Sequence, residues 1–224
     1  MMKKTIERSR LVGIDEIHLR EAPDGAESRT IAGRAIVFDT PSSAIFEGSD
    51  WEIREVIARE AVSKQLLDRS DIKMTMFHDR QLILARSNQG KGTLKYEVKP
   101  DGVYFEFEAP RTTDGDKAIE LVKRRDIAGC SFSFVAEYGN REKVEYSAET
   151  VDGREIETYT VREIESILDF TLAADPAYGE TDVALLRELH ATPPAPDAAQ
   201  EPSHEAKAEE QWREMREKIR NSKF

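Results

Sequence analysis

The sequence predicts a mainly β domain (α+β) with a few helices and a flexible C-terminal tail. Apolar and polar residues alternate with period two in several short runs, which is the pattern of half-buried strands. One Pro-Asp-Gly turn, residues 100–102, joins two such runs and predicts a hairpin. After residue 190 the alternation gives way to a segment rich in Pro and Ala, which is typical of an extended linker.

The composition limits the classes of protein to which the chain can belong. Its 224 residues are enough for one substantial domain with an appendage. The formal charge is −11, from 33 Lys and Arg against 44 Asp and Glu, so we expect no nucleic-acid partner. No apolar run reaches the roughly 18 residues of a membrane span, and no apolar segment follows the basic N-terminus as in a signal peptide. The single cysteine, Cys130, excludes an internal disulfide and a cysteine-rich metal site. A soluble, cytoplasmic protein is the simplest interpretation.

The elements of the domain can be placed in chain order. Alternation predicts strands at residues 14–19, 30–38, 92–98 and 103–108. Helical spacing predicts one helix over about residues 58–69 and another over about 116–125, whose acidic start and basic end complement the helix dipole. The inward-facing residues are Val62, Leu66 and Leu67 in the first helix and Ala118, Ile119 and Val122 in the second.

These elements divide the chain into three regions. Residues 1–27 form an N-terminal lead-in with the first strand, and residues 28–190 form the main domain. Residues 191–224 form the Pro/Ala linker and a charged tail. In this tail Trp212, Met215 and Ile219 have helical spacing, which predicts a short, mostly solvated helix.

Two residues in strand-like runs could form a nucleophile and its base. Alternation over residues 130–138 places Phe132, Phe134 and Ala136 on one face of a strand and Ser131, Ser133 and Val135 on the other. His78 follows another apolar run, at the end of a predicted strand. A serine becomes a good nucleophile only when a neighbouring base accepts its proton. The alternative is that the serines are small polar fillers and the histidine is a surface residue.

A third residue could orient the histidine. Asp169 lies in the predicted strand 163–172 between apolar neighbours, and a buried carboxylate needs a partner. His78 could be that partner, and so could one of the arginines. Glu163 and Glu165 remain alternatives for the acid, because a predicted hairpin with an Asp152-Gly153 turn separates the serine from this strand. Ser133 and Cys130 remain alternatives for the nucleophile.

The order and spacing of five segments resemble the prohead (capsid maturation) proteases of tailed bacteriophages over about residues 28–189. These segments are Ile31–Phe38, Trp51–Val62, His78 with Leu84–Ser87, Gly129–Phe134 and Leu168–Tyr178. Gly129–Phe134 is similar to the family's Gly-Met-Ser-Phe-Gly-Phe, with Ser131 at the nucleophile and Ser133 at the usual glycine. Asp169 stands at the family's acidic position, where glutamate is usual, so its reach is one methylene shorter.

The resemblance implies a serine endopeptidase with the triad His78, Ser131 and Asp169 and without a metal or organic cofactor. It implies a small, largely antiparallel β-barrel wrapped by helices, similar to herpesvirus assemblins, with oxyanion donors near Gly129–Ser131. The enzyme would be packaged inside the immature capsid in the bacterial host cytoplasm. Its substrates would be scaffold segments of the major capsid protein and then itself, which makes the tail removable. Whether it forms a homo-oligomer stays open. The main alternative is a non-catalytic scaffold or assembly protein with the same fold.

Overall fold

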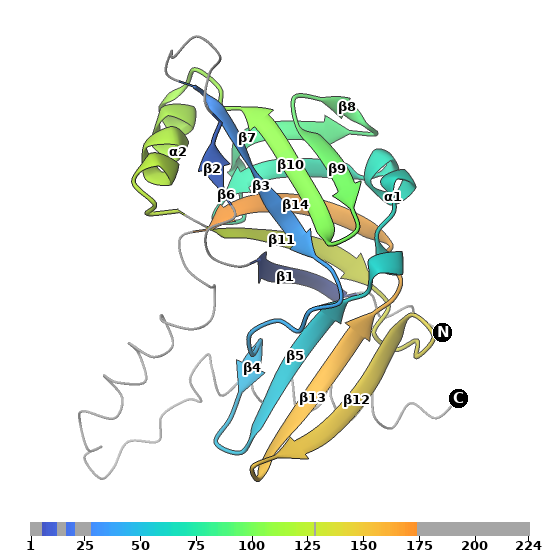
Figure 1. The fold of residues 1–224 in the computed structure, drawn as a ribbon. Helices are drawn as coiled ribbons and strands as arrows, with labels where there is room; N and C mark the ends of the chain where they lie inside the picture. Colours follow the sequence, from blue (N-terminus) through green and yellow to red (C-terminus); the bar gives the residue numbers. More distant parts are fainter. Residues whose placement is uncertain (1–5, 13–16, 21–27, 128, 174–224) are drawn as a thin grey trace, which may run out of the picture.

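The structure is a computed structural model, and it describes residues 6–12, 17–20, 28–127 and 129–173. The strands form three sheets, as Figure 1 shows. The mainly β fold predicted from the alternation is therefore confirmed. The predicted linker and tail at 191–224 lie outside the described residues, as do residues 14–16 of the first predicted strand; of its described residues, His18–Leu19 form β2.

The six-stranded sheet carries the residues singled out above. Its strand order is β1 (Ile6–Val12), β11 (Gly129–Ala136), β14 (Ser166–Ala173), β6 (Asp71–Met76), β7 (Asp79–Asn88) and β8 (Lys91–Gly92). All neighbours are antiparallel except β14 and β6, which run parallel. Strand β11 is thus an interior strand, and β14 connects it to the β6–β7 hairpin.

A four-stranded sheet packs on the six-stranded one (Figure 1). Its order is β2, β3 (Thr30–Val37), β10 (Gly102–Glu108) and β9 (Lys95–Lys99). The predicted Pro-Asp-Gly hairpin is present, since Lys99 pairs with Gly102 across β9 and β10. The core lies between the two sheets, where the rings of Phe105 and Phe170 have centroids 6.5 Å apart. Phe132 and Phe134 are fully buried there, as their shared face predicted.

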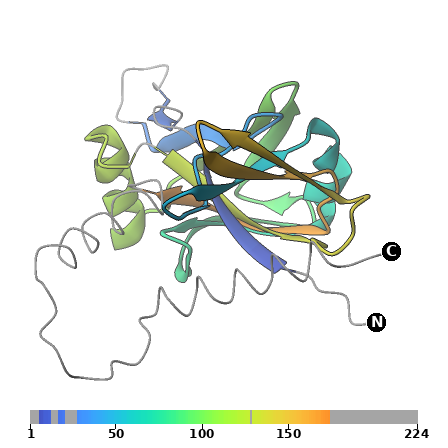
Figure 2. The same ribbon diagram turned by 90° about the horizontal axis from the view of Figure 1, so that it is seen from below.

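The predicted β-barrel is wrong, because the described strands form three separate sheets that do not close into a barrel. Parallel pairing of β13 (Arg154–Val161) with β5 (Trp51–Ile57) builds a sheet of its own, completed by β12 (Val144–Val151) and β4 (Phe46–Glu47). These strands are consequently not available to close a ring with the other two sheets. Seen from below in Figure 2, this third sheet lies in front of them. The β12–β13 hairpin turns at Asp152-Gly153, as predicted, with φ values of 52° and 82°.

Hydroxyl caps set the helix boundaries. Residues 58–69 form a 3-10 turn, η1 (Arg59–Ala61), and a short helix, α1 (Lys64–Arg69), rather than one helix. The break occurs because Val62 is extended and the Ser63 hydroxyl caps the N-terminus of α1 by accepting from the Leu66 N–H. Helix α2 (Thr113–Lys123) begins earlier than predicted, because the Thr112 hydroxyl caps the Gly115 N–H. The six predicted inward residues are all buried.

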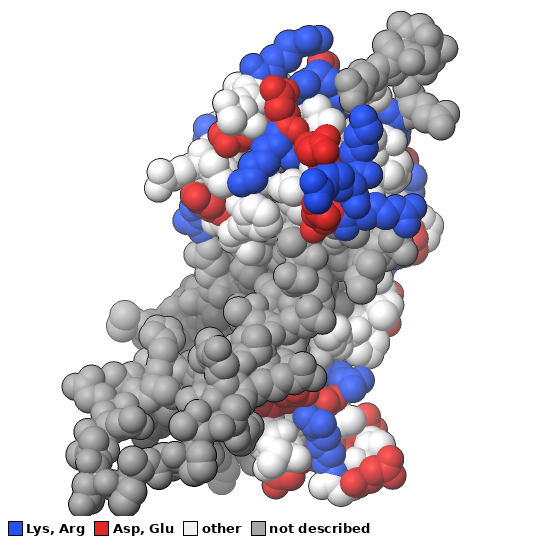
Figure 3. Space-filling model, turned by 90° about the vertical axis from the view of Figure 1, so that its left-hand side faces the viewer, with Lys and Arg blue, Asp and Glu red and all other residues white. Residues whose placement is uncertain are grey.

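The surface on the α2 side mixes both signs of charge. Figure 3 shows Lys and Arg side chains interspersed with Asp and Glu over the upper part of this face. Ion pairs there include Arg29 with Asp116 at 2.8 Å and Arg124 with Asp126 at 2.8 Å. None of the helices in the described residues is long and apolar enough to span a membrane.

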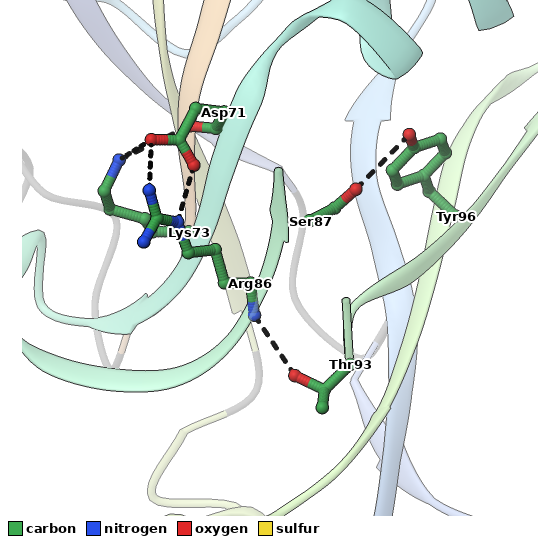
Figure 4. A network of polar contacts seen from close by, with 6 residues as sticks. All are labelled: Asp71, Lys73, Arg86, Ser87, Thr93 and Tyr96. Atoms are coloured by element: carbon green, nitrogen blue, oxygen red, sulfur yellow. Dashed lines mark hydrogen bonds and ion pairs between the residues drawn. The ribbon is translucent and has the colours of Figure 1, made fainter. Parts of the chain in front are cut away.

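An ion cluster ties β6 to β7 near their outer ends (Figure 4). The Asp71 carboxylate accepts from Arg86 Nε at 2.7 Å and Nη2 at 2.8 Å, and from Lys73 Nζ at 3.0 Å. The backbone N–H of Arg86 donates to Thr93 Oγ1 at 3.3 Å, which links β7 to the residues after β8. The Arg86 hydrogen bonds, with those of Lys73, lower the pKa of Asp71 to about 2.

We expect this cluster to make stability depend on pH in the acid range. A carboxyl whose pKa is lower in the folded state stabilises the protein above its unfolded pKa of about 3.9 and loses this contribution as the pH falls. The difference in unfolding free energy between wild type and Asp71→Asn should therefore be full above about pH 5, decrease as the pH falls through the lowered pKa of about 2, and vanish below it. Because the cluster is exposed, we expect at most about 1 kcal/mol. Denaturant titrations between these pH values measure it.

The Arg86→Gln background supplies the control for this prediction. There, Asp71→Asn should lose most of its pH dependence, because the main cause of the lowered pKa is gone. An equal difference at every pH in the wild-type background would show that Asp71 acts by packing and not by charge.

Candidate active site

Four polar side chains share one face of β11 and β14. Ser131 pairs with Thr171, and Ser133 pairs with Asp169, two positions further along the same antiparallel ladder. Paired residues in a ladder point to the same face, and residues two apart along a strand do so as well. The exposed fraction of each of these residues is 2% or less. The strand phase predicted for the two serines is therefore correct, and the face they occupy is buried rather than half-exposed.

His78 lies in the tight turn between β6 and β7. Phe77 and His78 are the two central residues, with φ values of 56° and 55°. Two left-handed residues in succession are typical of a hairpin turn that usually contains Asn-Gly. Because Phe77 and His78 are bulky, this conformation needs support from their surroundings.

Strand β14 supplies that support. The Phe77 N–H donates to the Leu172 carbonyl at 3.1 Å, and the His78 N–H donates to Thr171 Oγ1 at 2.9 Å. Thr171 is itself held by the Thr75 hydroxyl at 2.9 Å. The turn is thus fastened to the same strand that carries Asp169.

The imidazole of His78 connects Ser131 to Asp169. Its Nδ1 lies 2.9 Å from Asp169 Oδ1, and its Nε2 lies 2.9 Å from Ser131 Oγ. A carboxylate can only accept, so Nδ1 carries the proton, and the lone pair of Nε2 is left to accept from the serine hydroxyl. This is the arrangement that allows a histidine to remove the serine proton while a carboxylate stabilises the resulting imidazolium.

The other candidate acids lie elsewhere. Glu163 Oε1 pairs with Lys143 Nζ at 2.7 Å. Glu165 is exposed, precedes β14 and has its N–H bound to the Val135 carbonyl at 2.8 Å. The carboxylate that meets His78 is that of Asp169.

The other candidate nucleophiles are also placed differently from Ser131. Cys130 is fully buried on the phenylalanine face of β11, and burial raises the pKa of its thiol above the usual range, so it is not a ready thiolate. Ser133 does contact His78, but its Oγ lies 3.2 Å from Nδ1, the nitrogen turned away from Ser131.

The strand pairing limits two of the three residues near which oxyanion donors are expected, while Gly129 pairs with β14 alone. Cys130 and Ser131 pair with β1 on one side and with β14 on the other. Their backbone N–H groups are therefore engaged in the ladders and not free to bind an oxyanion. Among the described residues, no group of three or more His, Cys, Asp or Glu side chains is arranged to hold a metal ion.

Thr171 is the residue of this site that sequence reasoning did not single out. It shares the phase of Asp169 in β14 and is completely buried although polar. A polar residue two positions after the candidate acid was the available signal. Its partner, the backbone of a turn 93 positions away, was not visible in the sequence.

A family model and a solved structure are similar to this chain. Residues 15–194 match the model of a family described as caudovirus prohead serine protease, and this range contains all three residues of the hydrogen-bonded chain. Among solved structures, the capsid assembly protease gp21 of bacteriophage T4 is similar, with 11% sequence identity and a TM-score of 0.35. That match covers 73% of this chain and 95% of gp21. No curated protein matches the chain.

Proposed function

This chain belongs to the caudovirus prohead serine proteases and is therefore a serine-type endopeptidase of phage capsid maturation, and we propose that Ser131, His78 and Asp169 are its catalytic triad. The observation that carries the proposal is the continuous hydrogen-bonded chain from Ser131 Oγ through both ring nitrogens of His78 to Asp169 Oδ1. The non-catalytic scaffold alternative gives no reason for such a chain, nor for the left-handed turn that holds His78.

In the proposed mechanism, His78 Nε2 accepts the Ser131 proton while Oγ attacks the scissile carbonyl. The tetrahedral intermediate collapses to an acyl-enzyme as the imidazolium gives its proton to the departing amine. Water then attacks the ester with His78 again acting as base. Asp169 holds the Nδ1–H and stabilises the positive charge on the ring in both halves of the reaction.

The substrates we propose are scaffold segments of the major capsid protein and this chain itself, cleaved inside the immature capsid in the host cytoplasm. Support comes from the family and from the sequence after residue 190. A sequence rich in Pro and Ala is typical of a linker that a protease can cleave, which suits self-removal of the tail.

Labelling with a fluorophosphonate tests the assignment of the nucleophile, because this reagent phosphonylates only activated serines. We expect peptide mass spectrometry to find the label on Ser131, and expect labelling to disappear in the His78→Ala variant. Ser133→Ala is the matched control, since it removes a hydroxyl from the same face and should still be labelled. A label on Ser133, or unchanged labelling of His78→Ala, would contradict the proposal.

A further inference from the structure

The His78 ring contacts a third side chain in addition to Ser131 and Asp169, the other two members of the proposed triad. Ser133 Oγ lies 3.2 Å from Nδ1, next to the Asp169 oxygen at 2.9 Å from the same nitrogen. Ser133 and Asp169 are direct partners across β11 and β14. Two oxygens from one rung of the ladder therefore converge on one ring nitrogen.

The ring consequently spans two rungs of the β11–β14 ladder. Its Nε2 meets the rung formed by Ser131 and Thr171, and its Nδ1 meets the rung formed by Ser133 and Asp169. The torsion that rotates an imidazole about its bond to Cβ is broad and roughly two-fold, so the ring needs external contacts to keep one orientation. The His78 side chain is 26% exposed, so packing alone encloses it incompletely.

We propose that Ser133 is a positioning residue for the proposed triad. Its hydroxyl oxygen is the second, uncharged contact at Nδ1, and together with Asp169 it keeps the ring in the orientation that directs Nε2 at Ser131. It also favours the tautomer with the proton on Nδ1, because an oxygen beside that N–H stabilises it. The inference rests on the triad assigned above, through which Ser133 acts without touching the substrate.

Steady-state kinetics supply the first test. Losing one neutral hydrogen bond predicts that kcat of Ser133→Ala falls roughly two- to tenfold while KM stays the same, since only the alignment of the base changes. Ser133→Thr, which keeps the hydroxyl, should recover kcat, and Ser133→Val, which has the shape of Thr without the hydroxyl, should not. A kcat of Ser133→Ala equal to that of the wild type would overturn the inference.

A spectroscopic readout separates this inference from the triad assignment and holds even if the Thr and Val variants fail to fold. In full-length Ser131→Ala protein, which should not cleave itself, ring nitrogen NMR reports the tautomer of His78. Adding Ser133→Ala should shift the Nδ1 proton resonance and raise the share of the Nε2-protonated tautomer. An unchanged spectrum overturns the role of Ser133 alone, whereas continued cleavage by Ser131→Ala overturns the triad.

Discussion

Replacing Ser131 by Ala is expected to abolish proteolysis while the protein stays folded. Without the hydroxyl there is no oxygen to form the acyl-enzyme, and removal of a nucleophilic serine from such a triad lowers kcat by roughly 10⁴-fold or more. Among the described residues, the Ser131 hydroxyl has a single hydrogen-bond partner, His78 Nε2, so the unfolding free energy should change by no more than about 1 kcal/mol. Co-expression with the capsid-protein precursor measures processing, and the mass of the variant itself shows whether the tail is retained.

Ser87→Ala is the matched control for this variant. Ser87 is 1% exposed in β7 of the same sheet, and its hydroxyl contacts the Tyr96 hydroxyl at 3.4 Å, away from His78. Processing should continue in this control. If Ser131→Ala also processes the precursor and its own tail normally, Ser131 is not the nucleophile, and the scaffold alternative regains support.

The parts of the site that sequence reasoning predicts well are those fixed by local strand phase. Alternation over β11 alone separates Ser131 and Ser133 from Phe132 and Phe134, because successive side chains in a strand face opposite sides. The same argument in β14 places Asp169 on the face opposite Phe170, whereas the burial of that face depends on tertiary packing. Which carboxylate meets the histidine depends on the register between strands distant in the sequence, and there Glu163 and Glu165 could not be excluded.

The features that the sequence did not predict depend on strand pairing over long sequence distances and on side-chain caps. Parallel pairing of β5 with β13, about 100 positions later, decides that a third sheet forms instead of a barrel, and no local pattern encodes it. The parallel pairing of β14 with β6 likewise brings Thr171 to the His78 turn. The caps at Ser63 and Thr112 were predictable in principle, since hydroxyl residues are typical of helix starts. The predicted helix boundaries instead followed the spacing of apolar residues.

Replacing Asp169 by Asn is expected to lower kcat by roughly 10³- to 10⁴-fold with little change in the fold. Asparagine has nearly the shape of aspartate, but its amide can donate to Nδ1 where the carboxylate only accepts. The ring proton then moves to Nε2, which becomes a donor toward Ser131 and can no longer remove its proton. Single-turnover cleavage of a peptide spanning a capsid-protein processing site, with thermal unfolding in parallel, measures both effects.

Glu157→Gln is the control that separates a loss of catalysis from the general effect of neutralising a buried acid. Glu157 is completely buried in β13 of the third sheet, with its carboxylate 3.5 Å from the Tyr159 hydroxyl, so its neutralisation perturbs a buried acid away from His78. Glu157→Gln should lower the unfolding temperature and have little effect on kcat per folded molecule. Asp169→Asn should have little effect on the unfolding temperature and lower kcat strongly. A loss in Asp169→Asn smaller than tenfold would mean that His78 is oriented chiefly by Ser133 and by the fastening of its turn to Thr171, with the carboxylate contributing little to the proton transfer.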